Sequence, residues 1–186
     1  MMRMLLRLAR AVDTLSRFSG GITRWATLLM VFVGTYNAVA RYVGRALGLP
    51  LASNAYLELQ WYLFSVLFLM GASYALRHGA HVRVDVFYAR FSPPLQAWLD
   101  LLGMLLFAIP FCLAVLYFSW PSVWNSWQIK ELSPDPGGLP RYPIKTVILI
   151  GFGLLFLQGV SEAIKRWAWL RGLSGDWEPA EGGGRI

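Results

Sequence analysis

The sequence contains one cysteine and two histidines among 186 residues, which limits the chemistry that the chain can perform. Cys112 stands alone, and a disulfide or a cluster of cysteine ligands needs at least two thiols. His78 and His81 are three residues apart, but no third ligand accompanies them in a metal-binding spacing. They also lie beyond the apolar stretches, whereas a haem anchor needs histidines at the centre of facing helices. We therefore predict neither a metal site nor a bound cofactor.

Sequence motifs of known enzyme classes are absent as well. There is no H-E-x-x-H motif, no phosphate-binding loop and no arrangement of Ser, His and Asp typical of hydrolases. The carboxylates are also too scattered to form an acid–base couple. The sequence predicts a protein that is not an enzyme.

Ionisable residues are missing from four long apolar stretches. These stretches are Trp25–Ala40, Leu59–Leu76, Leu101–Ile129 and Thr146–Ser161. With its borders, each one reaches the roughly 20 residues that a helix needs to cross the hydrocarbon core of a bilayer. A carrier or pump normally holds its cargo with polar or charged groups inside the membrane. The absence of such groups indicates a membrane protein that does not itself hold the cargo.

The composition, 56% hydrophobic, places the chain among membrane proteins. We predict an all-α integral membrane protein with four transmembrane helices in residues 21–166. The expected spans cover about 22–43, 55–76, 95–127 and 144–164. Residues 167–186 form a tail with a glycine-rich end that we expect to be disordered, and no remaining segment is long enough for a soluble domain.

Residues 1–20 predict a basic amphipathic helix at the membrane surface. Its polar face is Arg3, Arg7, Arg10, Thr14 and Arg17, and its apolar face is Leu5, Leu8, Val12 and Leu15. The alternative is a secretory signal peptide, but the charged region is too long and no compact apolar core with a small-residue cleavage site follows it. We expect the segment to be retained and Gly20-Gly21 to bend the chain into the first span.

The net charge of +7 does not indicate nucleic acid as a partner, because no soluble module exists to present a basic patch. The basic residues instead flank the apolar stretches, where they set membrane orientation. If the N-terminus is cytoplasmic, the inner side holds Arg3, Arg7, Arg10, Arg17, Arg24, Arg77, Arg83, Arg90, Lys165, Arg166, Arg171 and Arg185. The outer side then holds Arg41, Arg45, Lys130, Arg141 and Lys145. This excess predicts that both termini are cytoplasmic.

Charged residues near the ends of the spans are expected to form structural ion pairs. The predicted pairs are Arg41 with Glu58, Arg83 with Asp85, and Glu162 with Arg166 four residues later. Asp85 is also a candidate N-cap for a short interfacial helix in the loop after the second span. Asp100 is expected to lie near Arg77 and Arg83.

The segment before the fourth span has two unusual features. Trp120, Trp124 and Trp127 share one face of a helix, either as an aromatic belt at the membrane surface or as a docking face for a partner. The following KELSPDPGGLPRYPIK contains four prolines and a Gly-Gly pair, which predict a stiff, shaped turn.

Two segments carry a family resemblance. HVRVDVFYARFSP and SWPSVWNSWQIKELSPDPGGLPRYPIK resemble the small, DctQ-like permease subunit of tripartite ATP-independent periplasmic (TRAP) transporters. The similarity extends over about residues 15–166 and is closest to the branch associated with 2-oxo acids, mannitol and chloroaromatic acids. It implies a multi-pass protein of the bacterial inner membrane.

The resemblance also implies a division of labour. A periplasmic binding protein captures an organic acid, and a large permease subunit carries it with a sodium gradient, so sodium is expected on that subunit. The small subunit would pack against the large one, contact membrane lipid and help to dock the binding protein. The candidate docking residues are Trp124, Trp127, Asp135 and Arg141.

Two rival functions remain. A self-sufficient four-span carrier typically has a membrane-embedded glutamate, and Glu58 lies too near the end of a span for that role. A membrane anchor of a respiratory enzyme would be distinguished by a haem absorption band.

Overall fold

The structure, a computed structural model, describes residues 2–79, 88 and 90–173. Its elements are α1 (Met2–Leu47), α2 (Asn54–Arg77), α4 (Pro93–Gly103), a π-helix (Met104–Ala108), α5 (Ile109–Gln128) and α6 (Arg141–Leu170). Four helical segments are long and apolar enough to cross a membrane: α1, α2, the continuous segment from α4 to α5, and α6. The described residues contain no strand. The predicted all-α membrane fold with four spans is confirmed.

The first helix differs from the prediction. α1 is helical from Met2 to Leu47 without a break at Gly20-Gly21, so the predicted surface helix and the first span form one continuous helix. At 1.5 Å per residue, its 46 residues extend about 69 Å, well beyond the roughly 30 Å of a hydrocarbon core. Gly20 leaves space for a neighbouring side chain, since a Cβ on Gly20 would lie 2.3 Å from Cδ2 of Tyr74 on α2.

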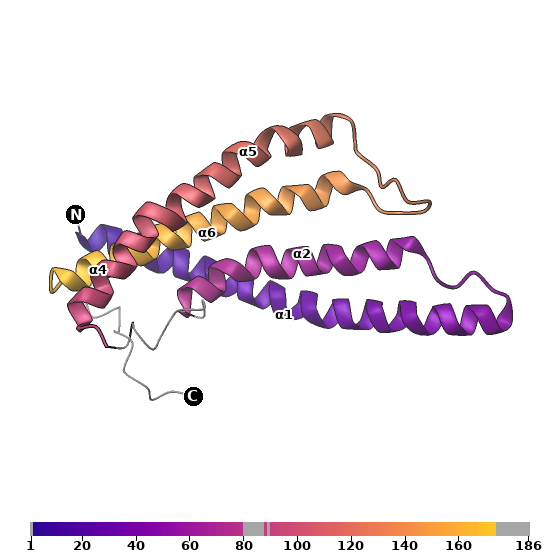
Figure 1. The fold of residues 1–186 in the computed structure, drawn as a ribbon, viewed down its shortest axis with the longest axis horizontal. Coiled ribbons are helices and arrows are strands. Elements are labelled where there is room, and N and C mark those ends of the chain that lie inside the picture. Colours follow the sequence, from indigo (N-terminus) through magenta and orange to yellow (C-terminus); the bar gives the residue numbers. More distant parts are fainter. Residues whose placement is uncertain (1, 80–87, 89, 174–186) are drawn as a thin grey trace.

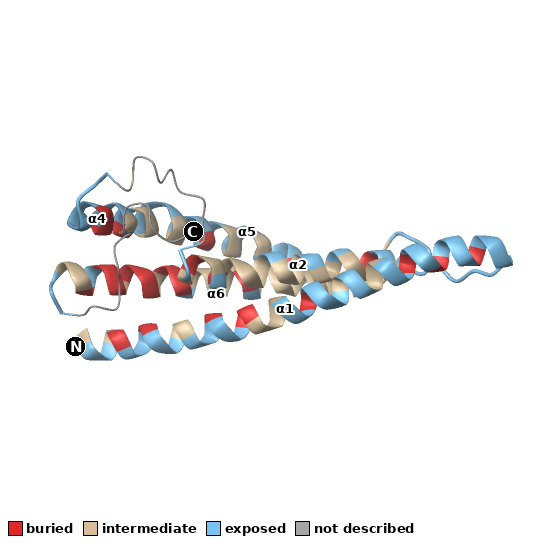
Figure 2. Ribbon diagram, turned by 90° about the horizontal axis from the view of Figure 1, so that it is seen from below, coloured by how far each residue is buried: buried red, intermediate tan, exposed pale blue. Residues whose placement is uncertain are grey.

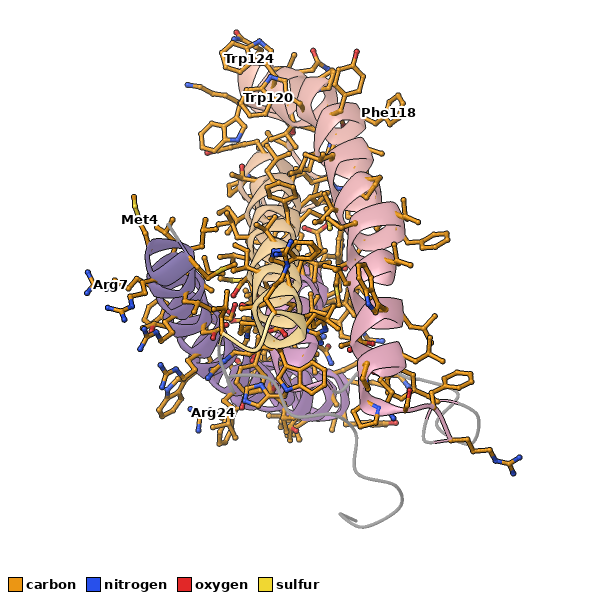
Figure 3. The ribbon with its side chains drawn as sticks, turned by 90° about the vertical axis from the view of Figure 1, so that its left-hand side faces the viewer. Met4, Arg7, Arg24, Phe118, Trp120 and Trp124 are labelled. Carbon is orange, nitrogen blue, oxygen red and sulfur yellow. The ribbon has the colours of Figure 1, made fainter. Side chains whose placement is uncertain are left out.

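The N-terminal part of α1 packs on its neighbours through a face that is neither the basic nor the leucine face. Its arginines are exposed, as expected, and Arg7 and Arg24 project away from the other helices (Figure 3). Leu8 and Leu15, however, are exposed too. The face that packs against the rest of the molecule instead carries small and polar residues together with one leucine: Leu6, Ala9, Ser16, Ser19 and Gly20.

The helices form two hairpins held together by α6. α1 packs on α2, and α6 contacts α1, α2, α4 and α5. In Figure 1, α6 lies between α5 and α2, and in Figure 2 its C-terminal half lies between α4 and α1. We call the end where α1 begins and α6 ends the terminus end, and the opposite end, with the connections 48–53 and 129–140, the turn end. Most buried positions of α6 lie near the terminus end (Figure 2).

Close packing between α2 and α6 depends on a small residue. A Cβ on Gly151 of α6 would lie 2.7 Å from Cβ of Leu69 and 2.9 Å from its carbonyl oxygen. Membrane helices associate through such close approaches because burying apolar side chains gives little driving force in lipid. Gly151 therefore sets the distance between the two hairpins at mid-length.

The π-helix between α4 and α5 has a local cause. Pro110 has no N–H, and its ring would clash with the carbonyl group four residues earlier in a regular α-helix. The helical turn before Pro110 contains one extra residue, and the N–H of Ile109 donates to the carbonyl oxygen of Met104 five residues back. The third span thus continues through Pro110 without a break.

Candidate functional site

At the turn end, Glu58 of α2 fastens the connection between α5 and α6. Its side chain is only 1% exposed and accepts hydrogen bonds from the Ser133 hydroxyl and the backbone N–H of Leu139. Glu58 and Arg41 form no ion pair, so that predicted pair is wrong. Arg41 is exposed on α1, whereas Glu58 faces the 129–140 connection, which satisfies it with neutral donors.

Two further bonds attach this connection to α2. Asn54 Nδ2 donates to the carbonyl oxygen of Pro136 at 3.1 Å, and the Tyr62 hydroxyl donates to that of Pro140 at 3.2 Å. With Glu58, these residues occupy successive turns of one face of α2. The predicted stiff turn is therefore fastened along its length, and proline is not its only source of rigidity.

Glu131 joins the start of the same connection to α5 and α6. Its carboxylate accepts hydrogen bonds from Lys145 and from the Ser126 hydroxyl, the latter at 2.7 Å. Its backbone oxygen accepts from the N–H of Arg141 at 2.8 Å. The hydrogen bond from Lys145, followed by that from Ser126, holds the pKa of Glu131 below its ordinary value.

The four candidate docking residues do not form one surface. Asp135 is exposed near the tip of the connection. Arg141 is partly buried, and its guanidinium lies 5.9 Å from the centre of the Trp61 ring. This cation–π contact connects the end of the turn to α2. Trp127 donates from Nε1 to the Thr146 hydroxyl at 2.8 Å.

Trp124 lines the same groove between α5 and α6 as Trp127. It is 60% exposed and, with Trp120, projects sideways from α5 when the molecule is viewed along its long axis (Figure 3). Exposed indoles near the end of a span have the exposure that an aromatic belt at a membrane surface needs.

At the terminus end, buried polar side chains bring α1 and α6 together. Asp13 of α1 accepts hydrogen bonds from Gln158 Nε2 at 2.9 Å and from Lys165 Nζ at 3.1 Å. Gln158 also accepts from the Ser16 hydroxyl at 2.6 Å, and the Ser161 hydroxyl donates to the carbonyl oxygen of Ala9 at 3.1 Å. This cluster crosses between two helices that are far apart in the sequence.

The cluster extends along α6 to α4. Glu162 accepts from Lys165 and from Arg166, so its spacing of four residues from Arg166 does produce an ion pair. Arg166 Nε also lies 2.9 Å from Asp100 Oδ2. Arg77 Nε lies 3.9 Å from Asp13, and position 83, the other neighbour expected for Asp100, lies outside the described residues. Positions 83 and 85, the third predicted pair, lie outside the described residues.

We name Asp13, Arg77, Asp100, Glu162, Lys165 and Arg166 the ion cluster. Its carboxylates and cations balance in number, and it contains groups from α1, α2, α4 and α6. Every carboxylate in it has a cationic partner. This pairing fits a structural role that holds the helices together, and it leaves no unpaired carboxylate for proton transfer. Sequence reasoning missed Asp13, although it is the only acidic residue before Glu58 and shares a helix face with Ser16 and Ser19.

Neither end offers a metal or haem site within the described residues. No three His, Cys, Asp or Glu side chains come together there as a metal-binding group. His78 lies at the end of α2, where its Nδ1 is 2.8 Å from the carbonyl oxygen of Tyr74 and its ring packs on the tyrosine ring. In the described part of the chain, hydrogen bonds and ion pairs connect the helices at both ends, and the segments between these ends carry no charged residues.

Comparison with known proteins agrees with these features. Residues 30–168, more than half of the chain, match the family model described as "Tripartite ATP-independent periplasmic transporters, DctQ component". No match was found among curated proteins or among solved structures. The matched range runs from within α1 to near the end of α6 and so includes the whole turn end. The chain therefore belongs to the DctQ family, the small membrane components of TRAP transporters.

Proposed function

We propose that this chain is a non-catalytic scaffold subunit that packs against the large permease subunit of a sodium-coupled TRAP transporter. One observation carries the proposal: every carboxylate in the described helices is paired or hydrogen-bonded at one of the two ends. A transport site needs polar groups that can exchange partners with a cargo or an ion. Sodium and substrate therefore belong to the large subunit.

The substrate is proposed to be an organic acid, in keeping with the resemblance to the 2-oxo acid, mannitol and chloroaromatic branch. We place the turn end on the periplasmic side and both termini in the cytoplasm. The support is the distribution of basic residues, of which twelve would then lie inside and five outside.

The proposed docking surface for the periplasmic binding protein is the exposed tip of the 129–140 connection. Asp135 provides an exposed charge there, Arg141 braces the turn, and Trp124 and Trp127 border it on the α5 side. The bonds from α2 to the turn support this role, because a pre-ordered loop loses little conformational entropy on binding.

The docking role is tested by reversing the charge at the tip. Asp135→Lys should slow organic acid uptake by cells carrying all three components, while the membrane complex still assembles. Arg45→Glu, a charge reversal of the same size and opposite sign at the turn end of α1, is the control and should have little effect. Replacing Trp127 and Arg141 together should also lower uptake. Unchanged uptake in the Asp135 variant would remove the docking role.

The scaffold role is tested in proteoliposomes. The purified chain alone should transport no organic acid under a sodium gradient, and addition of the large subunit and the binding protein should restore uptake. Uptake by the chain alone would show that it is a self-sufficient carrier.

A further inference from the structure

We propose that a groove between the turn ends of α5 and α6 binds a phospholipid of the surrounding membrane, with its phosphate at Lys130. The groove has a volume of about 640 Å³ and is lined by Trp120, Trp124, Trp127, Lys130, Thr146 and Leu149. This inference depends on the membrane fold and goes beyond the proposed scaffold function.

The position of the groove favours lipid over a soluble protein. Trp120 and Trp124 project sideways from α5, away from the long axis of the molecule (Figure 3). Because the four helices run along that axis (Figure 1), the sideways direction is the one in which a bilayer surrounds the protein. Exposed indoles at the end of a span lie at headgroup depth.

The lining of the groove has an apolar part and a cationic end, which match the acyl chain and the phosphate of a phospholipid. Leu149 lies on α6, two turns into the helix, and provides apolar surface for an acyl chain. Lys130 lies beyond the last turn of α5, at the membrane-surface end of the groove. A lysine there complements a phosphate, while a neutral apolar partner helix would leave its charge unpaired.

Lys130 is available for this role. Among the described residues it forms no ion pair, whereas Lys145, the neighbouring cation, is bonded to Glu131. Lys145 lines a different pocket, beside Trp61 on α2. Lys130 is therefore the unpaired cation of this groove within the described chain.

The backbone conformation at position 130 favours glycine, so the lysine found there needs another explanation. Both α5 and α6 end in a Schellman motif: Glu131 N donates to Ser126 O, and Leu173 N donates to Ala168 O. The left-handed position is Gly172 in α6, with φ of 65°, but Lys130 in α5, with φ of 47°. Glycine is the residue that this position favours, so the lysine at the end of α5 is not explained by helix capping.

The test is native mass spectrometry of the full chain, purified from membranes in mild detergent and supplied with phosphatidylglycerol. Lys130→Gly should reduce retained lipid about tenfold, with a melting temperature equal to or above that of the wild type, because glycine suits the left-handed backbone. Lys130→Arg should retain lipid. Arg45→Gln is the control, since Arg45 is an exposed cation at the turn end of α1.

Three outcomes would overturn the proposal. Equal lipid retention by the wild type and Lys130→Gly would exclude the lysine, and equal loss in Arg45→Gln would indicate non-specific annular lipid. Displacement of the lipid by inorganic phosphate alone would show that the acyl chain is not held. Independently, a photo-crosslinking amino acid in place of Trp124 should react with lipid in native membranes, and a crosslink to a protein chain would identify the groove as a protein interface.

Discussion

Lys165 Nζ on α6 lies 3.1 Å from Asp13 Oδ1 on α1, across a sequence separation of 152 residues. This contact joins the first helix to the last at the terminus end and belongs to the ion cluster. In lipid, apolar side chains are solvated almost equally well in separated and packed helices. Hydrogen-bonded charges that lipid cannot satisfy therefore carry much of the specificity of helix association.

Replacing Asp13 with asparagine should destabilise the folded chain by about 1–3 kcal/mol, because it weakens charged hydrogen bonds with Lys165 and Gln158. The measurement is the free energy of unfolding in detergent. Thr14→Ala is the control, since its exposed hydroxyl bonds only within α1. An equal loss in both variants would mean that the contact between α1 and α6 contributes nothing measurable.

The ion cluster shows what the sequence alone could predict. Glu162 and Arg166 are paired as their helical spacing indicates. Asp100 and Asp13 required the tertiary arrangement, because nothing local reveals that α6 lies between α4 and α1. The four spans followed from hydropathy, but the relative order of the helices in space did not.

A second prediction concerns the contact between α2 and α6. Gly151→Ala should destabilise the packing by about 1–3 kcal/mol, because its Cβ would overlap Leu69, including the backbone carbonyl. Gly153→Ala is a matched control two residues along, where a Cβ meets nothing within 4 Å. That control should be neutral or slightly stabilising, since alanine favours a helix over glycine. Thermal unfolding in detergent compares the two, and a more stable Gly151 variant would contradict the geometry.

A third prediction concerns the fastening of the turn. Glu58→Gln should weaken acceptance of the bonds from Ser133 and Leu139, because a neutral amide oxygen accepts less strongly than a carboxylate. Amide hydrogen exchange across residues 131–139 should accelerate several-fold. Asp135→Asn, within the turn but exposed, should leave the exchange nearly unchanged. Unaltered protection in the Glu58 variant would show that the turn is rigid without this anchor.

The same residue shows why one predicted pair is wrong. Arg41 and Glu58 were natural partners for a hairpin whose charged ends face each other. The 129–140 connection, however, folds back over α2 and supplies the donors itself. The prolines and the Gly-Gly pair predict that this segment is stiff, but they do not predict which helix it packs against. The packing of the 129–140 connection against α2 is a tertiary contact, and this contact determines the environment of Glu58.

A fourth prediction concerns pH. The pKa of Glu131 is below its ordinary value of 4.5, chiefly because Lys145 donates to its carboxylate. A lowered pKa means that this carboxylate stabilises the fold fully above the ordinary value and loses that contribution as pH falls through the folded pKa. The difference in melting temperature between wild type and Glu131→Gln should thus be steady from about pH 7 to 5 and shrink below about pH 4.5. A difference that grows on acidification would contradict this assignment.

The central claim is that this chain works as one membrane component of a larger transporter. The most direct measurement is purification of the tagged chain from its native membranes in mild detergent, followed by identification and quantification of the proteins that remain bound. We predict a large multi-span permease subunit in a constant ratio to the chain. Recovery of the chain alone, stable and able to transport organic acids after reconstitution, would contradict the account.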